Sequence, residues 1–176
     1  MLIQFITAVV VVLLAAPAAS LTLESPAFKD KRPIPRVYTC QGLDVSPALT
    51  WEKAPEKTRS FVLIVEDPDV PDPAAPTRTW VHWVLYDIPA NATGLPRDVA
   101  SAQLPEGTRE GTNDWKQAGY GGPCPPIGRH RYLWKLYALS EKLPNLDLPN
   151  ARKLEQAMQG LILAQTTLVG TYEKVD

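Results

Sequence analysis

Residues 59–71, RSFVLIVEDPDVP, combine a nearly unbroken apolar run with an acidic, proline-rich end. Such a run, without polar alternation, is typical of a strand that is buried on both faces of a sheet. Residues 80–88 (WVHWVLYDI) and 131–139 (RYLWKLYAL) are similarly rich in β-branched and aromatic side chains. We therefore expect these segments to form the centre of one sheet, with carboxylates where the first strand leaves the core.

Weaker signals surround this centre. Residues 48–52 and 166–172 predict shorter strands, and residues 89–117 are rich in turn formers and predict connecting structure. Asn150 is a good helix N-cap, and it precedes an apolar stripe at helical spacing: Leu154, Ala157, Met158, Leu161 and Ile162. Strands do not alternate with helices, which argues against a parallel, doubly wound sheet. The pattern predicts a mainly β protein: an antiparallel β-sandwich with a large central sheet, a smaller sheet and few peripheral helices.

Composition places the chain among ordinary globular proteins. It has 176 residues, 21% of them charged, and a formal net charge of -1. A nucleic-acid partner is not expected, because binding to backbone phosphates needs a basic surface. The 18 prolines suit a strand-rich fold with many rigid loops.

The N-terminus has the features of an export signal. No charged side chain precedes Glu24, residues 5–16 are apolar apart from Thr7, and the small residues PAAS follow at 17–20. We expect a cleavable signal peptide at residues 1–20, a folded domain at residues 21–176, and a secreted or periplasmic protein. The usual basic start of a signal is missing. An uncleaved membrane anchor is therefore the alternative, since about 20 apolar residues span a bilayer.

Two cysteines, Cys40 and Cys124, lie in loop-like sequence. Export to an oxidising compartment would make them a candidate disulfide. Two separate thiols are the alternative, and the sequence leaves the choice open, because it does not give the distance between their Cα atoms.

The two histidines, His82 and His130, lie in unusual surroundings, one within an aromatic strand and one where a loop enters a strand. A single histidine in an apolar strand is most often a core residue. Asp67 and Asp69, at the end of the most apolar strand, change this interpretation, because a carboxylate can hold a nearby imidazole protonated. Together these groups predict a pocket for a small anion, whose binding weakens as pH rises through the histidine range.

The loop at 119–126, GYGGPCPP, is a candidate for the remaining donors. Gly121 and Gly122 let the backbone N–H groups approach a ligand closely, and the prolines fix the shape of the loop. An ordinary rigid turn has the same composition, so the loop alone is weak evidence for a site.

These motifs share an order with a known family. EDPDVP (66–71), WVHW (80–83), GYGGPCPP (119–126), GRHRY (128–132) and TTLVGTY (166–172), with YTCQG and SPALTW before them, resemble the phosphatidylethanolamine-binding protein family. The resemblance spans about residues 23–174 and is greatest to the bacterial and archaeal, Raf-kinase-inhibitor-like branch.

The resemblance implies a β-sandwich with one pocket for phosphate-like anions or phospholipid head groups. It implies that the ligand-binding residues are Asp67, Trp80, His82, Gly122, Pro123, His130 and Tyr132, supported by Asp69, Gly121 and Arg131. Cys124 stands where animal members have a second proline, so a different chemistry is expected for this loop. The chain also ends soon after TTLVGTYEK, without the C-terminal helix that partly covers the pocket in animal members. Phospholipid head-group binding and kinase regulation, known of animal relatives, are therefore expected to transfer poorly.

We therefore expect a binding protein without a cofactor or metal, in contact with membranes only through its signal segment or through lipid head groups. One alternative is an inhibitor of a protease or kinase that acts through surface loops. The other is a hydrolytic enzyme that uses Asp67, His82 and His130. No G-x-S-x-G or H-E-x-x-H pattern supports an enzyme or a zinc site.

Overall fold

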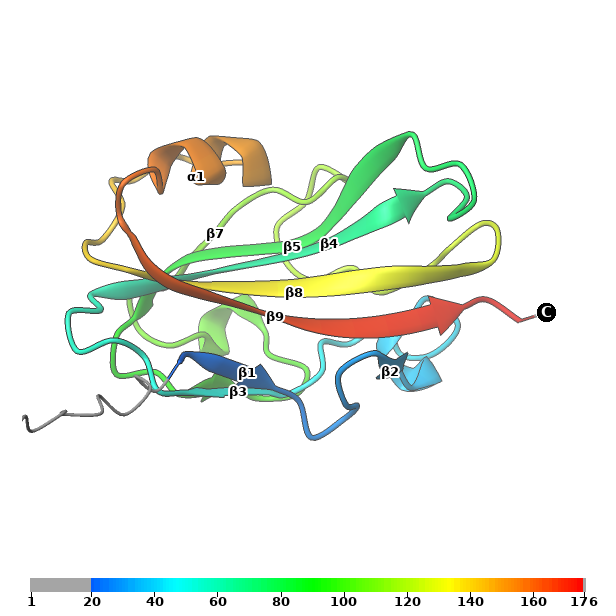
Figure 1. Ribbon diagram of the computed structural model, residues 1–176, viewed down its shortest axis with the longest axis horizontal. Helices are drawn as coiled ribbons and strands as arrows, with labels where there is room; N and C mark the ends of the chain where they lie inside the picture. The colour runs from blue at the N-terminus through cyan, green and yellow to red at the C-terminus, as the bar shows by residue number, and fades with distance from the viewer. Residues whose placement is uncertain (1–19, 176) are drawn as a thin grey trace, which may run out of the picture.

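Two β-sheets pack face to face in the computed structural model, which describes residues 20–175 (Figure 1). The six-stranded sheet has the order β2-β9-β8-β4-β5-β7, and the three-stranded sheet has the order β1-β3-β6. Along the chain the elements are β1 (Thr22–Glu24), β2 (Arg32–Pro33), η1 (Arg36–Tyr38), β3 (Leu49–Glu52), β4 (Ser60–Val70), β5 (Arg78–Pro89), β6 (Gly94–Leu95), η2 (Ser101–Gln103), β7 (Arg109–Glu110), β8 (Arg129–Leu139), α1 (Ala151–Ala157) and β9 (Ile162–Glu173). The predicted β-sandwich is confirmed.

The centre of the large sheet is β4, which pairs antiparallel with β5 on one side and β8 on the other. Its apolar residues 61–65 are each at most 1% exposed. This burial on both faces is what the continuous apolar run predicted. One pairing differs from an all-antiparallel arrangement, because the short β2 runs parallel to β9 at the edge of the sheet.

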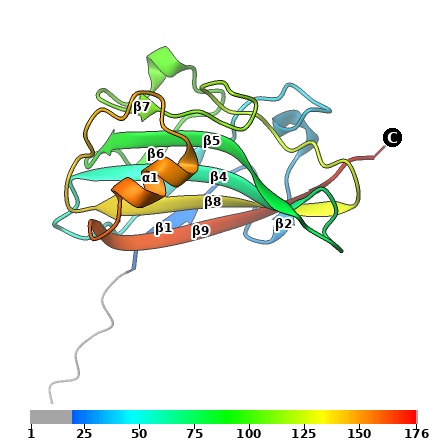
Figure 2. The same cartoon turned by 90° about the horizontal axis from the view of Figure 1, so that it is seen from above.

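The core has two layers, one on each face of the large sheet. Phe61, Leu63 and Val65 belong to the layer between the two sheets, which also contains Trp51 of the small sheet. Val62 and Ile64 point the other way and pack in the layer beneath α1. Figures 1 and 2 show α1 on the face of the large sheet opposite the small sheet.

The helix is shorter than its apolar stripe. The Asn150 side chain caps it by accepting a hydrogen bond from the backbone N–H of Lys153 at 2.9 Å, as expected. Leu154 is buried against the sheet, but the chain reverses at Gly160, which has a φ of 79°. Ile162 is therefore not part of the helix. It begins β9 and is 42% exposed.

The acidic end of the central strand stays in the sheet. We expected the strand to leave the core at these carboxylates, but β4 continues to Val70 because it keeps pairing with β5, Asp67 opposite Trp80 and Val70 opposite Arg78. Register shifts interrupt this part of the ladder. Bulges of this kind redirect side chains locally, and here they bring the carboxylates to the end of the sheet where β5 and β8 also carry polar groups.

A disulfide joins Cys40 to Cys124, whose Cα atoms are 5.5 Å apart although 84 positions separate them in sequence. It fixes the segment that follows η1 to the loop at 119–126. Within residues 20–175 no helix is long and apolar enough to cross a membrane. The predicted signal segment falls on residues 1–19, outside the described part of the chain, apart from its last residue, Ser20.

Candidate functional site

A buried ion pair lies where β4 and β8 meet the loop at 125–128. Asp67 Oδ2 lies 2.7 Å from Nδ1 of His130, and the side chains are 4% and 0% exposed. Nε2 of His130 lies 3.0 Å from the backbone oxygen of Ile127. A carboxylate and a carbonyl both accept hydrogen bonds, so His130 satisfies both when its two nitrogens each carry a proton. Both ring nitrogens therefore have partners within the protein, and one of these partners is the carboxylate of Asp67.

Asp69, two residues after Asp67 on β4, forms an ion pair with Arg131. Arg131 donates to Asp69 from its backbone N–H at 2.8 Å, from Nε at 2.9 Å and from a terminal nitrogen at 2.6 Å. These hydrogen bonds hold the pKa of Asp69 below its ordinary value, against the effect of burial. Asp69 in turn donates its backbone N–H to Asp67 Oδ1 at 2.8 Å. The two carboxylates are thereby fixed to each other and to β8.

His82, on β5, is held in a different way. Its Nδ1 lies 2.7 Å from the backbone oxygen of Gly121, so Nδ1 carries the proton and donates it there. The rings of Trp115 and Tyr132 meet it edge to face, with centroids 5.1 Å and 5.2 Å away. Burial lowers the pKa of His82 and outweighs the opposing effects of Gly121 and Asp67. At neutral pH the ring is therefore uncharged, and its Nε2 is a hydrogen-bond acceptor.

A cavity of about 350 Å³ lies against these groups. Its lining comes from the ends of β4 and β5, from the loop at 125–126 and from the turn that carries Trp115, as Asp67, Val70, Pro71, Arg78, Trp80, His82, Trp115, Cys124, Pro125 and Pro126. The guanidinium of Arg78 lies 4.5 Å from the ring centroid of Trp80, a cation–π contact at an exposed position. Among these lining residues, Arg78 is the one with a permanent positive charge.

The structure brings Asp67, His82 and His130 together on one side of the sheet, but it gives them different positions. Asp67, Trp80 and His82 line the cavity, whereas His130 and Tyr132 are 0% exposed and are not among the lining residues. His130 therefore positions Asp67 and the loop, because both of its nitrogens already have partners within the protein.

The predicted backbone donors are also occupied. The N–H of Gly121 donates to the oxygen of His82 at 3.0 Å, and the N–H of Gly122 donates to Asp44 Oδ1 at 2.7 Å. Pro123 is buried, and its oxygen accepts a hydrogen bond from the N–H of Cys40. These three residues shape the loop, and their groups that could bind an anion are not free.

Tyr132 adds a buried hydroxyl to the same region. Its oxygen is enclosed and has no hydrogen-bond partner among residues 20–175. Burial and the nearby negative charge of Asp67 raise its pKa far above the ordinary value, so the phenol stays protonated.

Among the lining residues that the sequence interpretation missed, Arg78 is the charged one and Trp115 is the aromatic one. Arg78 precedes Trp80 and His82 at intervals of two along one strand, and strand alternation places such residues on the same face. That spacing was a usable signal. Trp115 follows no such pattern, because it lies in a turn of the connecting segment.

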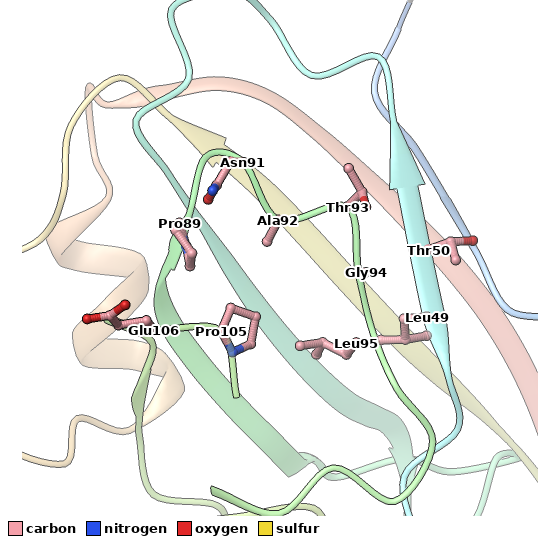
Figure 3. A pocket seen from close by; sticks show the side chains of 10 residues that line it. All are labelled: Leu49, Thr50, Pro89, Asn91, Ala92, Thr93, Gly94, Leu95, Pro105 and Glu106. Atoms are coloured by element: carbon pink, nitrogen blue, oxygen red, sulfur yellow. The ribbon is translucent and has the colours of Figure 1, made fainter. Parts of the chain in front are cut away.

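A larger cavity lies elsewhere, at the edge of the small sheet. Figure 3 shows its lining, in which Leu49 and Thr50 of β3 face Gly94 and Leu95 of β6 and the 105–106 loop. Its volume is about 630 Å³, yet among the residues that line it Glu106 is the only ionisable one. Chemistry therefore favours the smaller cavity as the functional site, because that is where charged and aromatic groups converge.

The smaller cavity is lined by groups that can contact a ligand. Its ten lining residues include no serine, threonine or tyrosine, and the sulfur of Cys124 is in the disulfide. No group of three His, Cys, Asp or Glu side chains within the described residues is arranged to hold a metal ion. Fold and cavity together define a β-sandwich protein with a small candidate ligand site at one end of its large sheet.

Comparison with known proteins specifies the family. The sequence model of the family described as "Phosphatidylethanolamine-binding protein" matches residues 24–173. A UPF0098 protein of Aquifex aeolicus is 44% identical over 165 residues, which cover 92% of this chain and 94% of the relative. A UPF0098 protein of Methanothermobacter thermautotrophicus is 43% identical over 158 residues, 88% of this chain and 99% of the relative.

Two solved structures share the fold. The homologue CT736 from Chlamydia trachomatis, described as a phosphatidylethanolamine-binding protein homologue, has a TM-score of 0.81 at 38% identity over 89% of this chain and 99% of its own. YbcL of E. coli, described as a member of the mammalian PEBP family, has a TM-score of 0.80 at 31% identity over 89% of this chain and 100% of its own. The chain belongs to the phosphatidylethanolamine-binding protein family, in its bacterial and archaeal branch, as its motifs predicted.

The state of His82 leads to a prediction about stability. Its folded-state pKa lies below the 6.5 of an unperturbed histidine, so at pH values below about 6.5 the unfolded chain binds a proton that the folded chain rejects. The free energy of unfolding should therefore fall on acidification, with a contribution of up to about 1.4 kcal/mol per pH unit. Urea unfolding between about pH 5.5 and 7.5 measures it.

His82→Asn is the matched variant, because an amide can still donate to the oxygen of Gly121 but does not titrate. The variant loses the packing of the imidazole ring and is therefore less stable at every pH. The comparison is between the pH dependences of the free energy of unfolding, and not between its absolute values. Equal pH slopes in the wild type and the variant would show that His82 is not held neutral.

Proposed function

We propose that this is an exported binding protein whose cavity takes a small phosphate-type anion that carries a proton. Membership of the family suggests a ligand-binding protein, and the choice of ligand rests on the polar groups of the cavity. The decisive observation is that Nδ1 of His82 donates to Gly121, which leaves an acceptor nitrogen for the ligand beside the carboxylate of Asp67.

Charge balance in the cavity supports this ligand class. Asp67 is paired with His130, His82 is uncharged, and Arg78 adds a positive charge at the exposed side of the cavity. A matching ligand therefore needs one negative oxygen for the guanidinium and one O–H for the acceptors. A phosphate monoester fits, because its second pKa is about 6 and it keeps a proton on one oxygen below that pH.

This argument predicts discrimination between phosphate and sulfate. Methyl phosphate should bind more tightly at about pH 6 than at pH 8, because the ligand loses its O–H as the pH rises. Methyl sulfate has no such proton and should bind at least about tenfold more weakly at pH 6, since two acceptors would face an oxygen that cannot donate. Isothermal titration calorimetry with both ligands measures this. Equal affinities for the two ligands would refute the proposed recognition.

The direction agrees with the expectation from the sequence, that binding weakens as pH rises, but the cause differs. In the expectation from the sequence, the titrating group is a histidine of the protein. In the proposal based on the cavity, it is the bound phosphate.

Arg78 should supply the main charge contact. Replacing Arg78 by Ala removes a charge-assisted hydrogen bond, worth about 1.5–3 kcal/mol, and should weaken methyl phosphate binding about 10- to 100-fold. Arg78→Lys should bind with intermediate affinity, because it keeps the charge without the planar guanidinium. Arg97, which stacks on Tyr38 and does not line the cavity, gives a matched control: Arg97→Ala should leave affinity unchanged. An unaltered affinity in Arg78→Ala would place the anion elsewhere.

Export is supported by two features of the described domain. Its first strand begins at Thr22, immediately after the predicted signal, and its disulfide suits an oxidising compartment. We expect the mature protein to start near Leu21 and to be found in the secreted or periplasmic fraction. N-terminal sequencing of the native protein tests this, and an intact Met1 in the cytosolic fraction would contradict it. Inhibition of a partner protease or kinase stays a prediction of the sequence.

A further inference from the structure

A second cavity adjoins the proposed anion site. It has a volume of about 260 Å³ and lies between the segment at 40–44, the turn at 113–117 and the loop at 120–122. Two residues, Trp115 and Cys124, line both cavities. Trp115 and Cys124 therefore form the wall between the two cavities.

The backbone that carries Trp115 is firmly attached. Asp114 donates its N–H to the oxygen of Val81 at 3.0 Å, and its side chain accepts the N–H of Val81 at 2.8 Å. The Asn113 side chain donates to the oxygen of Gly119 at 3.1 Å and accepts from the N–H of Gln117 at 3.1 Å. The turn is thus fixed on both sides of Trp115, and a substitution there should alter the side chain without displacing the loop.

The indole itself occupies a defined place. Its ring meets Trp80 and His82 edge to face at 5.3 Å and 5.1 Å, and it lies over Gly121 so closely that a Cβ at that position would be 2.6 Å from its Cζ3 atom. Yet Trp115 is 41% exposed, so little of the core depends on it. Cys124, the other part of the wall, is tied to Cys40.

We propose that Trp115 is the specificity-determining residue of the anion site and limits the substituent that a bound phosphate ester can carry. This inference rests on the proposed function and extends it to ligand size. With the indole in place, an ester bound between Arg78 and His82 has only the first cavity or the solvent for its substituent. Without the indole, the two cavities become continuous, and an aromatic substituent can be buried in the second.

The test compares a small and a large ester, methyl phosphate and 2-naphthyl phosphate, by calorimetry on the wild type, Trp115→Ala and Trp115→Phe. In Trp115→Ala the affinity for the naphthyl ester relative to the methyl ester should rise about tenfold or more, because the substituent becomes buried. Trp115→Phe keeps an aromatic wall and should stay close to the wild-type ratio. Thermal unfolding of each variant establishes that it is folded.

The outcomes separate the two proposals. If methyl phosphate binds to every variant and the ratio in Trp115→Ala stays within about twofold of the wild type, the role of Trp115 is refuted while the anion site stands. If neither ester binds to the wild type, the anion site is refuted, and the role of Trp115 falls with it. An equal rise of the naphthyl-to-methyl affinity ratio in Trp115→Phe and Trp115→Ala would also refute the role of Trp115. The phenylalanine ring would still separate the two cavities, so its ratio should stay close to that of the wild type.

Discussion

The hydrogen bond between Asp67 and His130 is the interaction on which this end of the molecule depends. A carboxylate that is 4% exposed is strongly disfavoured unless a cation and hydrogen-bond donors replace its water. His130 supplies the basic partner, and the N–H of Asp69 supplies another donor. The same imidazole then reaches the oxygen of Ile127, so the loop that places Pro125 and Pro126 on the cavity wall is attached to the charge pair. The ring thus connects the carboxylate of β4 directly to the loop.

Charge balance also explains why the motifs EDPDVP on β4 and GRHRY on β8 occur in the same protein. EDPDVP places the carboxylates of Asp67 and Asp69 close together on β4, where their mutual repulsion is unfavourable. GRHRY, at the start of β8, provides a basic partner for each of these two: His130 for Asp67 and Arg131 for Asp69. Because β4 and β8 are neighbours in the sheet, the strand pairing that builds the core also brings these four side chains into contact. Fold and site are thus consequences of the same register.

Sequence reasoning reached the strands because their signal is local. Apolar runs such as residues 61–65 predict burial wherever the chain goes, and the family motifs identified the strand ends that carry Asp67, His82 and His130. The predictions that proved wrong concerned features that depend on contacts between distant segments of the chain. The continuation of β4 past Asp67 depends on pairing with Arg78 and Trp80, and the end of α1 at Gly160 depends on the chain turning back into β9. Trp115 gave no signal at all, because its importance comes from lying over Gly121 and beside His82.

The two histidines show why residue type alone does not define a site. His130 has an acceptor at each nitrogen, one of them a carboxylate, so both nitrogens are engaged inside the protein. His82 has a carbonyl at one nitrogen and aromatic rings on its sides, so burial favours the neutral ring and leaves the other nitrogen as an acceptor. A charged donor in the wall would attract any anion, whereas a neutral acceptor attracts an anion that still has a proton to give. The selectivity proposed for this cavity therefore follows from the partner of Nδ1 in His82, the oxygen of Gly121, whose own N–H donates back to the oxygen of His82 and fixes the two segments together.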